Sequence, residues 1–130
     1  MKNVCDTVAA VLGAMIGFLF GPIDGMFYAL IAFVVLDYIS GVIAAAFCKE
    51  LSSSVGFKGI CKKVLLLSIV ALGNIIDVQI IGSGSTLRTA VIFVFLANEG
   101  ISLLENGAKL GLPIPKSLTR ILEQLKNKDE

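Results

Sequence analysis

Long apolar segments, separated by short polar breaks, dominate the sequence. The second of them, residues 26–48, contains a single charged residue, Asp37, near its middle. As a helix, this segment would match the roughly 30 Å hydrocarbon core of a bilayer. A carboxylate at that depth is costly and has to be held against protein or water. The pattern therefore predicts an all-α integral membrane protein with polar groups inside the membrane. The four apolar segments are residues 8–20, 26–48, 64–81 and 87–104.

The first apolar segment leaves the number of membrane crossings at three or four. Its uncharged core is short for a span, and Asp6 limits its extension toward the N-terminus. The length also fits the core of a signal peptide, but only Lys2 precedes it and no Ala-x-Ala-like cleavage site follows. A short or tilted helix is favoured, because bilayers adapt to modest mismatch. We expect helical hairpins with three to four transmembrane helices, in a single membrane domain of residues 1–130.

A C-terminal amphipathic helix is predicted at about residues 115–126. The preceding GLPIP sequence, residues 111–115, interrupts the last apolar helix because proline and glycine disfavour its continuation. We expect the new helix to rest on the inner leaflet or on a neighbouring subunit. Its apolar residues follow the i, i+3, i+4, i+7 spacing of a one-sided stripe: Leu118, Ile121, Leu122 and Leu125.

Basic residues gather in two parts of the chain. The polar stretch between the second and third segments, residues 49–63, contains Lys58, Lys62 and Lys63, and we interpret it as a basic loop. The tail is also basic, whereas the glycine-rich turns before the second and fourth segments contain no lysine or arginine. Because basic loops stay on the cytoplasmic side, the basic loop and the C-terminus are predicted to be cytoplasmic.

Composition supports contact with lipid and argues against an enzyme. Hydrophobic residues make up 56% of the 130 residues, and charged residues only 16%, below the about 25% of soluble domains. The net charge of +1 gives no indication of nucleic-acid binding. The absence of histidine removes Ser-His-Asp triads, Cys-His pairs and histidine zinc sites. We therefore expect no catalytic residues, no cofactor, no metal and no nucleic-acid partner.

Small residues recur at helical spacing in the first two segments. Gly13 and Gly17 form a Gly-x-x-x-Gly pair, and Gly41 with Ala45 forms a weaker version. In lipid, small residues let helix backbones approach closely, which supplies much of the packing energy. These helix-packing candidates indicate either a self-association face or ordinary packing within one protomer.

Polar residues within the apolar segments are candidates for gating. Counting about 1.5 Å per residue places Asp37 and Glu99 at a shared level near the midplane. Asp77 is expected nearer the outer side, where Arg88 could pair with it. The intramembrane candidates are Asp37, Asn74, Asp77, Arg88, Asn98, Glu99 and Glu105.

The fourth segment has one polar face on an otherwise apolar helix. Asn98, Ser102 and Glu105 are spaced i, i+4, i+7, and Glu99 and Asn106 extend the same face. Such a face must meet protein or water rather than lipid. It indicates a subunit contact or the wall of an aqueous lesion, or else a hydrogen-bonded cluster inside one protomer.

Several motifs occur together from the second segment onward. They are LDYISGVIAA at 36–45, GFKG at 56–59 followed by two lysines, ANEGISLLEN at 97–106 and GLPIP at 111–115. In this combination the chain resembles the toxin-secretion and phage-lysis holins, the small bacteriophage holin family. The resemblance covers nearly the whole chain from the second segment, and in the first segment it rests mainly on length and position.

The resemblance implies a small multi-pass protein of the bacterial cytoplasmic membrane that assembles with copies of itself and permeabilises the bilayer. An endolysin or a toxin then reaches the far side, with no direct contact required. A small ion channel or proton-linked transporter is the alternative, and a passive membrane anchor is a third. The positions that match the family are expected to act as structural or gating residues: Asp37, Gly41, Lys62, Lys63, Asp77, Arg88, Asn98, Glu99 and Glu105.

Overall fold

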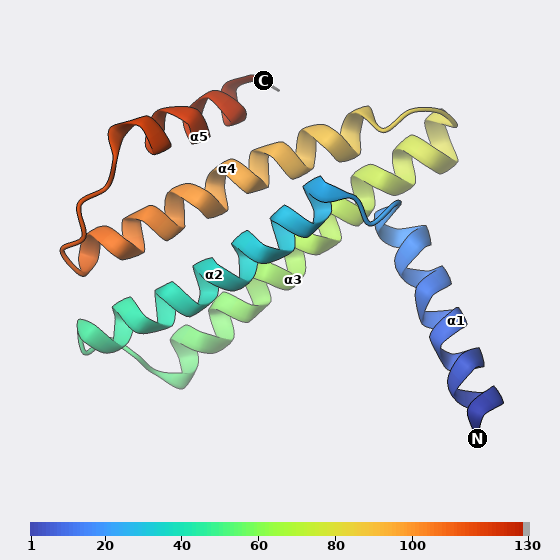
Figure 1. The fold of residues 1–130 in the computed structure, drawn as a ribbon, viewed down its shortest axis with the longest axis horizontal. Helices are drawn as coiled ribbons and strands as arrows, with labels where there is room; N and C mark the ends of the chain where they lie inside the picture. The colour runs from blue at the N-terminus through green and yellow to red at the C-terminus, as the bar shows by residue number, and fades with distance from the viewer. Residues whose placement is uncertain (129–130) are drawn as a thin grey trace.

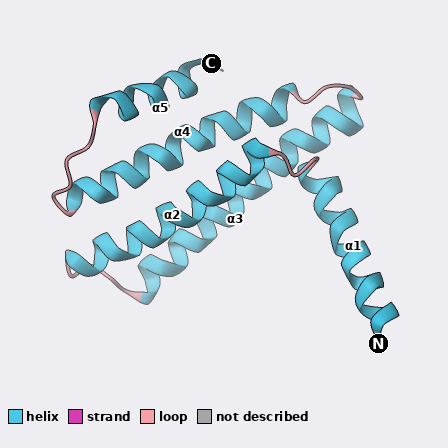
Figure 2. Ribbon diagram, in the orientation of Figure 1, coloured by secondary structure: helices cyan, strands magenta, loops and turns pink. Residues whose placement is uncertain are grey.

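The structure, a computed structural model that describes residues 1–128, consists of helices joined by short turns (Figure 1 and Figure 2). Four helices are long and apolar enough to cross a membrane, counting α3 together with the π-helix that continues it. The predicted fold class, an all-α membrane protein with helical hairpins and a C-terminal amphipathic helix, is confirmed. In chain order the helices are α1 (Lys2–Phe20), α2 (Gly25–Phe47), α3 (Ser53–Ile75), the π-helix η1 (Ile76–Ile81), α4 (Thr86–Lys109) and α5 (Lys116–Lys128).

The expected basic loop is mostly helical. Ser52 caps α3, because its side-chain oxygen accepts a hydrogen bond of 3.2 Å from the backbone N–H of Val55. The helix therefore begins at Ser53, and only the few residues before it form the turn after α2. Lys58, Lys62 and Lys63 accordingly lie on α3 rather than in a loop, which gives each a fixed position relative to α2 and α4.

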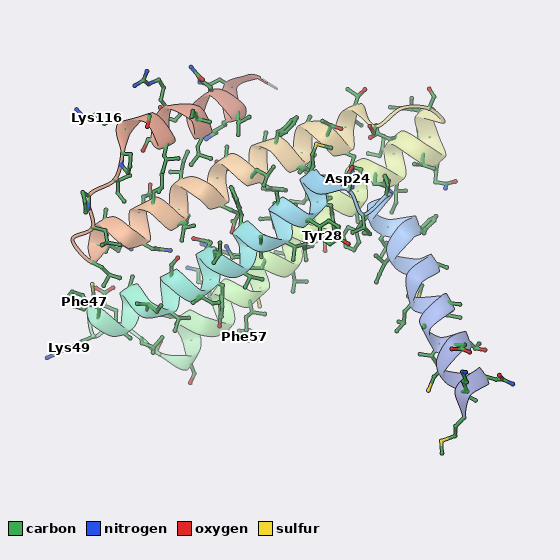
Figure 3. The ribbon with its side chains drawn as sticks, in the orientation of Figure 1. Asp24, Tyr28, Phe47, Lys49, Phe57 and Lys116 are labelled. Carbon is green, nitrogen blue, oxygen red and sulfur yellow. The ribbon has the colours of Figure 1, made fainter. Side chains whose placement is uncertain are left out.

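Helices α2, α3 and α4 form the bundle that contains the apolar core. Leu30 of α2, Val70 of α3 and Ile92 of α4 are all 0% exposed and belong to one cluster. Figure 3 shows Phe47 and Lys49 at one end of this bundle, with Asp24 at the other. We call these the Lys49 end and the Asp24 end.

Helix α1 stands apart from the bundle and meets it only near its C-terminal end (Figure 1). None of its residues is buried. Its glycines Gly13 and Gly17 have no atom within 4 Å of where a Cβ would lie. The proposed packing face of α1 is therefore unoccupied within this protomer.

Helix α5 turns back along α4 after the GLPIP segment (Figure 1). Gly100 of α4 makes room for it: a Cβ at Gly100 would come within 2.9 Å of a Leu122 methyl carbon. The expected resting places of this amphipathic helix were the leaflet or a neighbouring subunit. The structure instead packs it on α4 of its own chain.

The turn from α1 to α2 depends on Gly21. Its backbone angles, φ 74° and ψ −155°, fall in a region that essentially only glycine adopts. A Cβ there would also lie 2.6 Å from Oδ1 of Asn74 and 3.2 Å from Nε of Arg88. Backbone conformation and space therefore both require glycine at this position.

Replacing Gly21 with alanine should destabilise the protein by about 2 kcal/mol, the usual cost of a strained backbone position. Thermal unfolding in detergent micelles, followed by circular dichroism, measures the change. Gly25→Ala is the matched control, since Gly25 is helical and has open space around it. Equal melting temperatures for the two variants would contradict the assignment.

Candidate functional site

A half-buried lysine joins the three bundle helices near the middle of the bundle. Nζ of Lys63, on α3, forms salt bridges with Oδ2 of Asp37 on α2 and with Oε2 of Glu99 on α4. The side chains of the lysine, aspartate and glutamate are 17%, 9% and 11% exposed. We call these three residues the charge triad. Because each comes from a different helix, the triad fixes how α2, α3 and α4 sit against one another.

Asn106 adds a second polar tie between α4 and α2, about two helical turns beyond Glu99. Its Nδ2 donates to Oδ1 of Asp37 at 3.1 Å and to Oγ of Ser40 at 2.9 Å. Ser40 in turn donates to the backbone oxygen of Asp37 at 3.0 Å. The second carboxylate oxygen of Asp37 is thus bound as well, as a buried carboxylate requires.

A cavity of about 310 Å³ leads from the Lys49 end to the charge triad. Asp37 and Lys63 lie on its wall with Asn106, while Glu50 and Lys109 lie where it meets the end of the bundle. This volume is large enough for several water molecules, and the polar side chains on its otherwise apolar wall could bind them. Asp37 and Lys63 are therefore open to the cavity from one end of the bundle.

Charge is not balanced within the triad. With both carboxyls ionised, one lysine against two carboxylates leaves one net negative charge near the middle of the spans. A charge that moves across the membrane field changes energy by about 2.3 kcal/mol for each 100 mV. A rearrangement of the triad is therefore sensitive to the membrane potential.

A second polar cluster, which we call the α1 clasp, lies at the Asp24 end. Arg88 of α4 is 1% exposed, and its guanidinium binds the connection between α1 and α2. Nε donates to the backbone oxygen of Phe20 at 2.6 Å, and Nη2 donates to that of Pro22 at 2.7 Å. Nη1 forms a salt bridge of 3.0 Å with Asp24.

Asn74 completes the clasp from α3. Its Nδ2 donates to the backbone oxygens of Phe18 and Leu19, both at 3.1 Å. The last carbonyls of a helix have no partner within the helix. Asn74 and Arg88 supply those partners, so α1 is attached to the bundle through the end of its backbone. Phe20, its last residue, adds side-chain packing, with its ring centroid 5.1 Å from that of Phe27.

Asp77 and Arg88 do not pair through their side chains, contrary to expectation. The carboxylate of Asp77, 1% exposed on η1, accepts hydrogen bonds from the backbone N–H groups of Leu87 and Arg88, at 3.1 and 2.8 Å. Free N–H groups at the start of a helix attract a carboxylate. Asp77 therefore fixes the start of α4, and the Arg88 guanidinium is directed to Asp24.

Asp24 was missed as a site residue because it stands in a short turn sequence, GPIDG. Its Oδ1 also accepts the backbone N–H of Phe27 at 3.0 Å, which caps α2. An aspartate directly before an apolar helix is a recognised N-cap signal. The hydrogen bond from Arg88 holds the pKa of Asp24 below its ordinary value of 3.8, and the Phe27 hydrogen bond acts in the same direction.

The remaining candidates lie outside both clusters. Asn98 and Glu105 are exposed on α4, and Lys58 and Lys62 are exposed on α3. Gly41 lies beside Asn106, where a Cβ would be at an ordinary contact distance of 3.6 Å. The polar face predicted on α4 thus divides: Glu99 and Asn106 bind within the protomer, and Asn98 and Glu105 point outward.

Comparison with known proteins identifies the family. A model of the bacteriophage holin family matches residues 14–127. This chain belongs to the bacteriophage holin family. Holins are membrane proteins that assemble in the bilayer and typically have no enzymatic activity. No solved structure matches the chain.

Similar chains occur in Listeria and Clostridium species. An uncharacterized protein of Listeria monocytogenes is 47% identical over 110 residues, covering 85% of this chain and 78% of the relative. The uncharacterized 14.9 kDa protein in the nagH 3′ region of Clostridium perfringens is 41% identical over 132 residues, covering 98% and 99%. A further uncharacterized protein of that species is 39% identical, covering 97% and 94%.

Replacing Lys63 with methionine should lower the free energy of unfolding by about 3 kcal/mol, because two carboxyls would then face each other without their cation. Thermal unfolding in detergent micelles measures this change. The double variant Lys63→Met with Glu99→Gln should recover part of the loss, since only one carboxyl then remains.

Lys58→Met is the matched control, because Lys58 is exposed on the same helix. Additive effects of the Lys63 and Glu99 substitutions would show that these two side chains do not interact.

Replacing Asp24 with asparagine should lower the melting temperature by about 3 °C at neutral pH. The pKa of Asp24 is lower in the folded protein than its ordinary value of 3.8. Its stabilising contribution is therefore complete above pH 3.8 and is lost as the pH falls through the folded-state pKa. The difference between wild type and Asp24→Asn should shrink well below pH 3.8. A difference that is independent of pH would argue against the ion pair with Arg88.

Proposed function

We propose that this protein is a holin that assembles with copies of itself in the bacterial cytoplasmic membrane and opens lesions large enough for an endolysin or a toxin. The family assignment supports a membrane-permeabilising role. The observation that carries the proposal further is the charge triad, because it is a charged junction among three helices that can cross a membrane. Such a junction is costly inside a bilayer and is typically retained for function.

The closed state is held by the polar contacts within each protomer. Lys63 is shared by Asp37 and Glu99, and Asn106 ties α4 to α2 near the same level. As long as these groups bind one another, the protomer presents mainly apolar helix surfaces to lipid. Opening requires the polar groups to exchange these partners for water or for groups of other copies.

The membrane potential provides a trigger for that exchange. One net charge per protomer experiences about 2.3 kcal/mol for each 100 mV across the full membrane. Summed over the protomers of an assembly, this energy is large enough to prevent a cooperative transition, or to permit it once the potential is lost. Collapse of the potential, or a critical density of protomers, then switches the array.

Orientation follows from the basic residues. Lys58 and Lys62 lie near the Lys49 end of α3, and Lys109 lies where α4 reaches the same end. We place this end of the bundle, where α5 begins, on the cytoplasmic side, in keeping with the distribution of basic residues in membrane proteins. The Asp24 end and its α1 clasp then face outward, and the cavity opens toward the cytoplasm.

Controlled expression in a bacterium, with and without an endolysin that lacks a secretion signal, tests the proposal. We expect an abrupt loss of membrane potential in both cultures, but lysis and release of a cytoplasmic enzyme only when the endolysin is present. Turbidity, a potential-sensitive dye and enzyme activity in the medium provide the readouts. Loss of potential with the endolysin still trapped inside would indicate a small channel instead.

Glu99→Gln links the assay to the triad. The substitution removes a charged hydrogen bond of about 2 kcal/mol from the closed state. Lysis should therefore begin earlier at equal expression. Glu105→Gln is the matched control, because it makes the same change on an exposed position of α4. Identical timing for the two variants would remove Glu99 from the gating mechanism.

A further inference from the structure

The location of α5 indicates that lipid does not surround the protomer on all sides. Leu122 fits over Gly100, near the middle of α4, roughly 14 Å from the end of that helix at Lys109. Ile114, just before α5, lies over Gly107 at 3.6 Å from the position of a Cβ. The amphipathic helix thus lies alongside a spanning helix, at depths where the hydrocarbon core would otherwise be.

The outer face of α5 is charged. At 100° per residue, roughly, the polar residues gather on one side of the helix, and Leu122 and Leu125 gather on the side toward α4. Charged groups at mid-depth cannot face acyl chains without a large cost. The exposed polar residues are Lys116, Ser117, Arg120, Glu123, Gln124 and Asn127.

The surface of the other helices has the opposite character. Exposed large apolar side chains are spread over α1, α2 and α3, whereas on α4 only Leu87, at its first turn, is of this kind within the described residues. Helix α4 packs against α2, α3 and α5, and α5 covers part of it with charge outward. The protomer therefore has an apolar side suited to lipid and a charged side that must meet water.

We infer that the charged face of α5 lines the water-filled interior of the assembled lesion, with α5 still packed on α4. The inference rests on the proposed function, because it requires an assembly that encloses water. Ile121 of α5 is exposed, lies beside the charged face and is available for contact with the next copy. Lys116 and Arg120 outnumber Glu123, so the lining carries excess positive charge.

Ion selectivity of the purified full-length protein in planar bilayers tests the inference. At low salt and with a potassium chloride gradient, we expect a reversal potential that shows preference for chloride. Lys116→Glu combined with Arg120→Glu should shift the preference toward potassium. The control Lys58→Glu with Lys62→Glu makes the same charge change at the same end of the bundle, on exposed positions of α3, and should shift it much less.

Equal shifts in the α5 variant and the α3 control would overturn the inference, because both would then act only as surface charge near the lesion. Absence of any conductance in the wild type would instead refute the proposed function. The two failures are therefore distinguishable.

A cross-link tests whether α5 stays on α4. Gly100→Cys and Leu122→Cys, in a chain whose three exposed cysteines are replaced by serine, can be joined by a short thiol cross-linker. Conductance that persists after cross-linking supports the inference. Conductance that is lost on cross-linking and returns when a cleavable cross-linker is reduced would show that α5 has to leave α4, and would overturn it.

Discussion

A charge inside a bilayer has to find its partners within the protein, and this constraint determines how the bundle is built. Lys63 enters the space between α2 and α4 with a positive charge, and each of those helices supplies a carboxylate to meet it. Asn106 binds the remaining oxygen of Asp37. Apolar side chains pack around this junction, but packing alone does not fix the register of spanning helices as sharply as a shared ion does.

The two polar clusters stabilise different parts of the fold. The charge triad joins the long helices to one another, whereas the α1 clasp joins an otherwise separate helix to their Asp24 end. In both clusters, side chains of one helix bind polar groups in another part of the chain. Within the described residues, no buried side-chain nitrogen or oxygen lacks a hydrogen-bond partner. The polar groups that would be costly in lipid are therefore compatible with a stable folded protomer.

Periodicity and length were sufficient to predict the spanning helices, and depth counting was sufficient to bring Asp37 and Glu99 to one level. The position of Lys63 was not predictable in this way, because a lysine-rich stretch after a turn has the composition of a loop. The Ser52 cap places the start of α3 at Ser53. Lys63 therefore lies within a helix, where its side chain binds α2 and α4. The partner of Arg88 was missed for a related reason. Asp24 is distant from Arg88 in sequence, and the two side chains come together only in the folded bundle.

The attachment of α1 through its backbone has a consequence for how this protein can change over evolutionary time. Asn74 and Arg88 bind carbonyl oxygens, so their hydrogen bonds to α1 involve none of its side chains. Glycine is required only at position 21, directly after the helix. Substitutions along most of α1 therefore leave the bundle intact, provided the helix remains compatible with lipid. Within the protomer, the first helix is therefore less constrained by packing than the helices of the bundle, with Phe20 at its end as the exception.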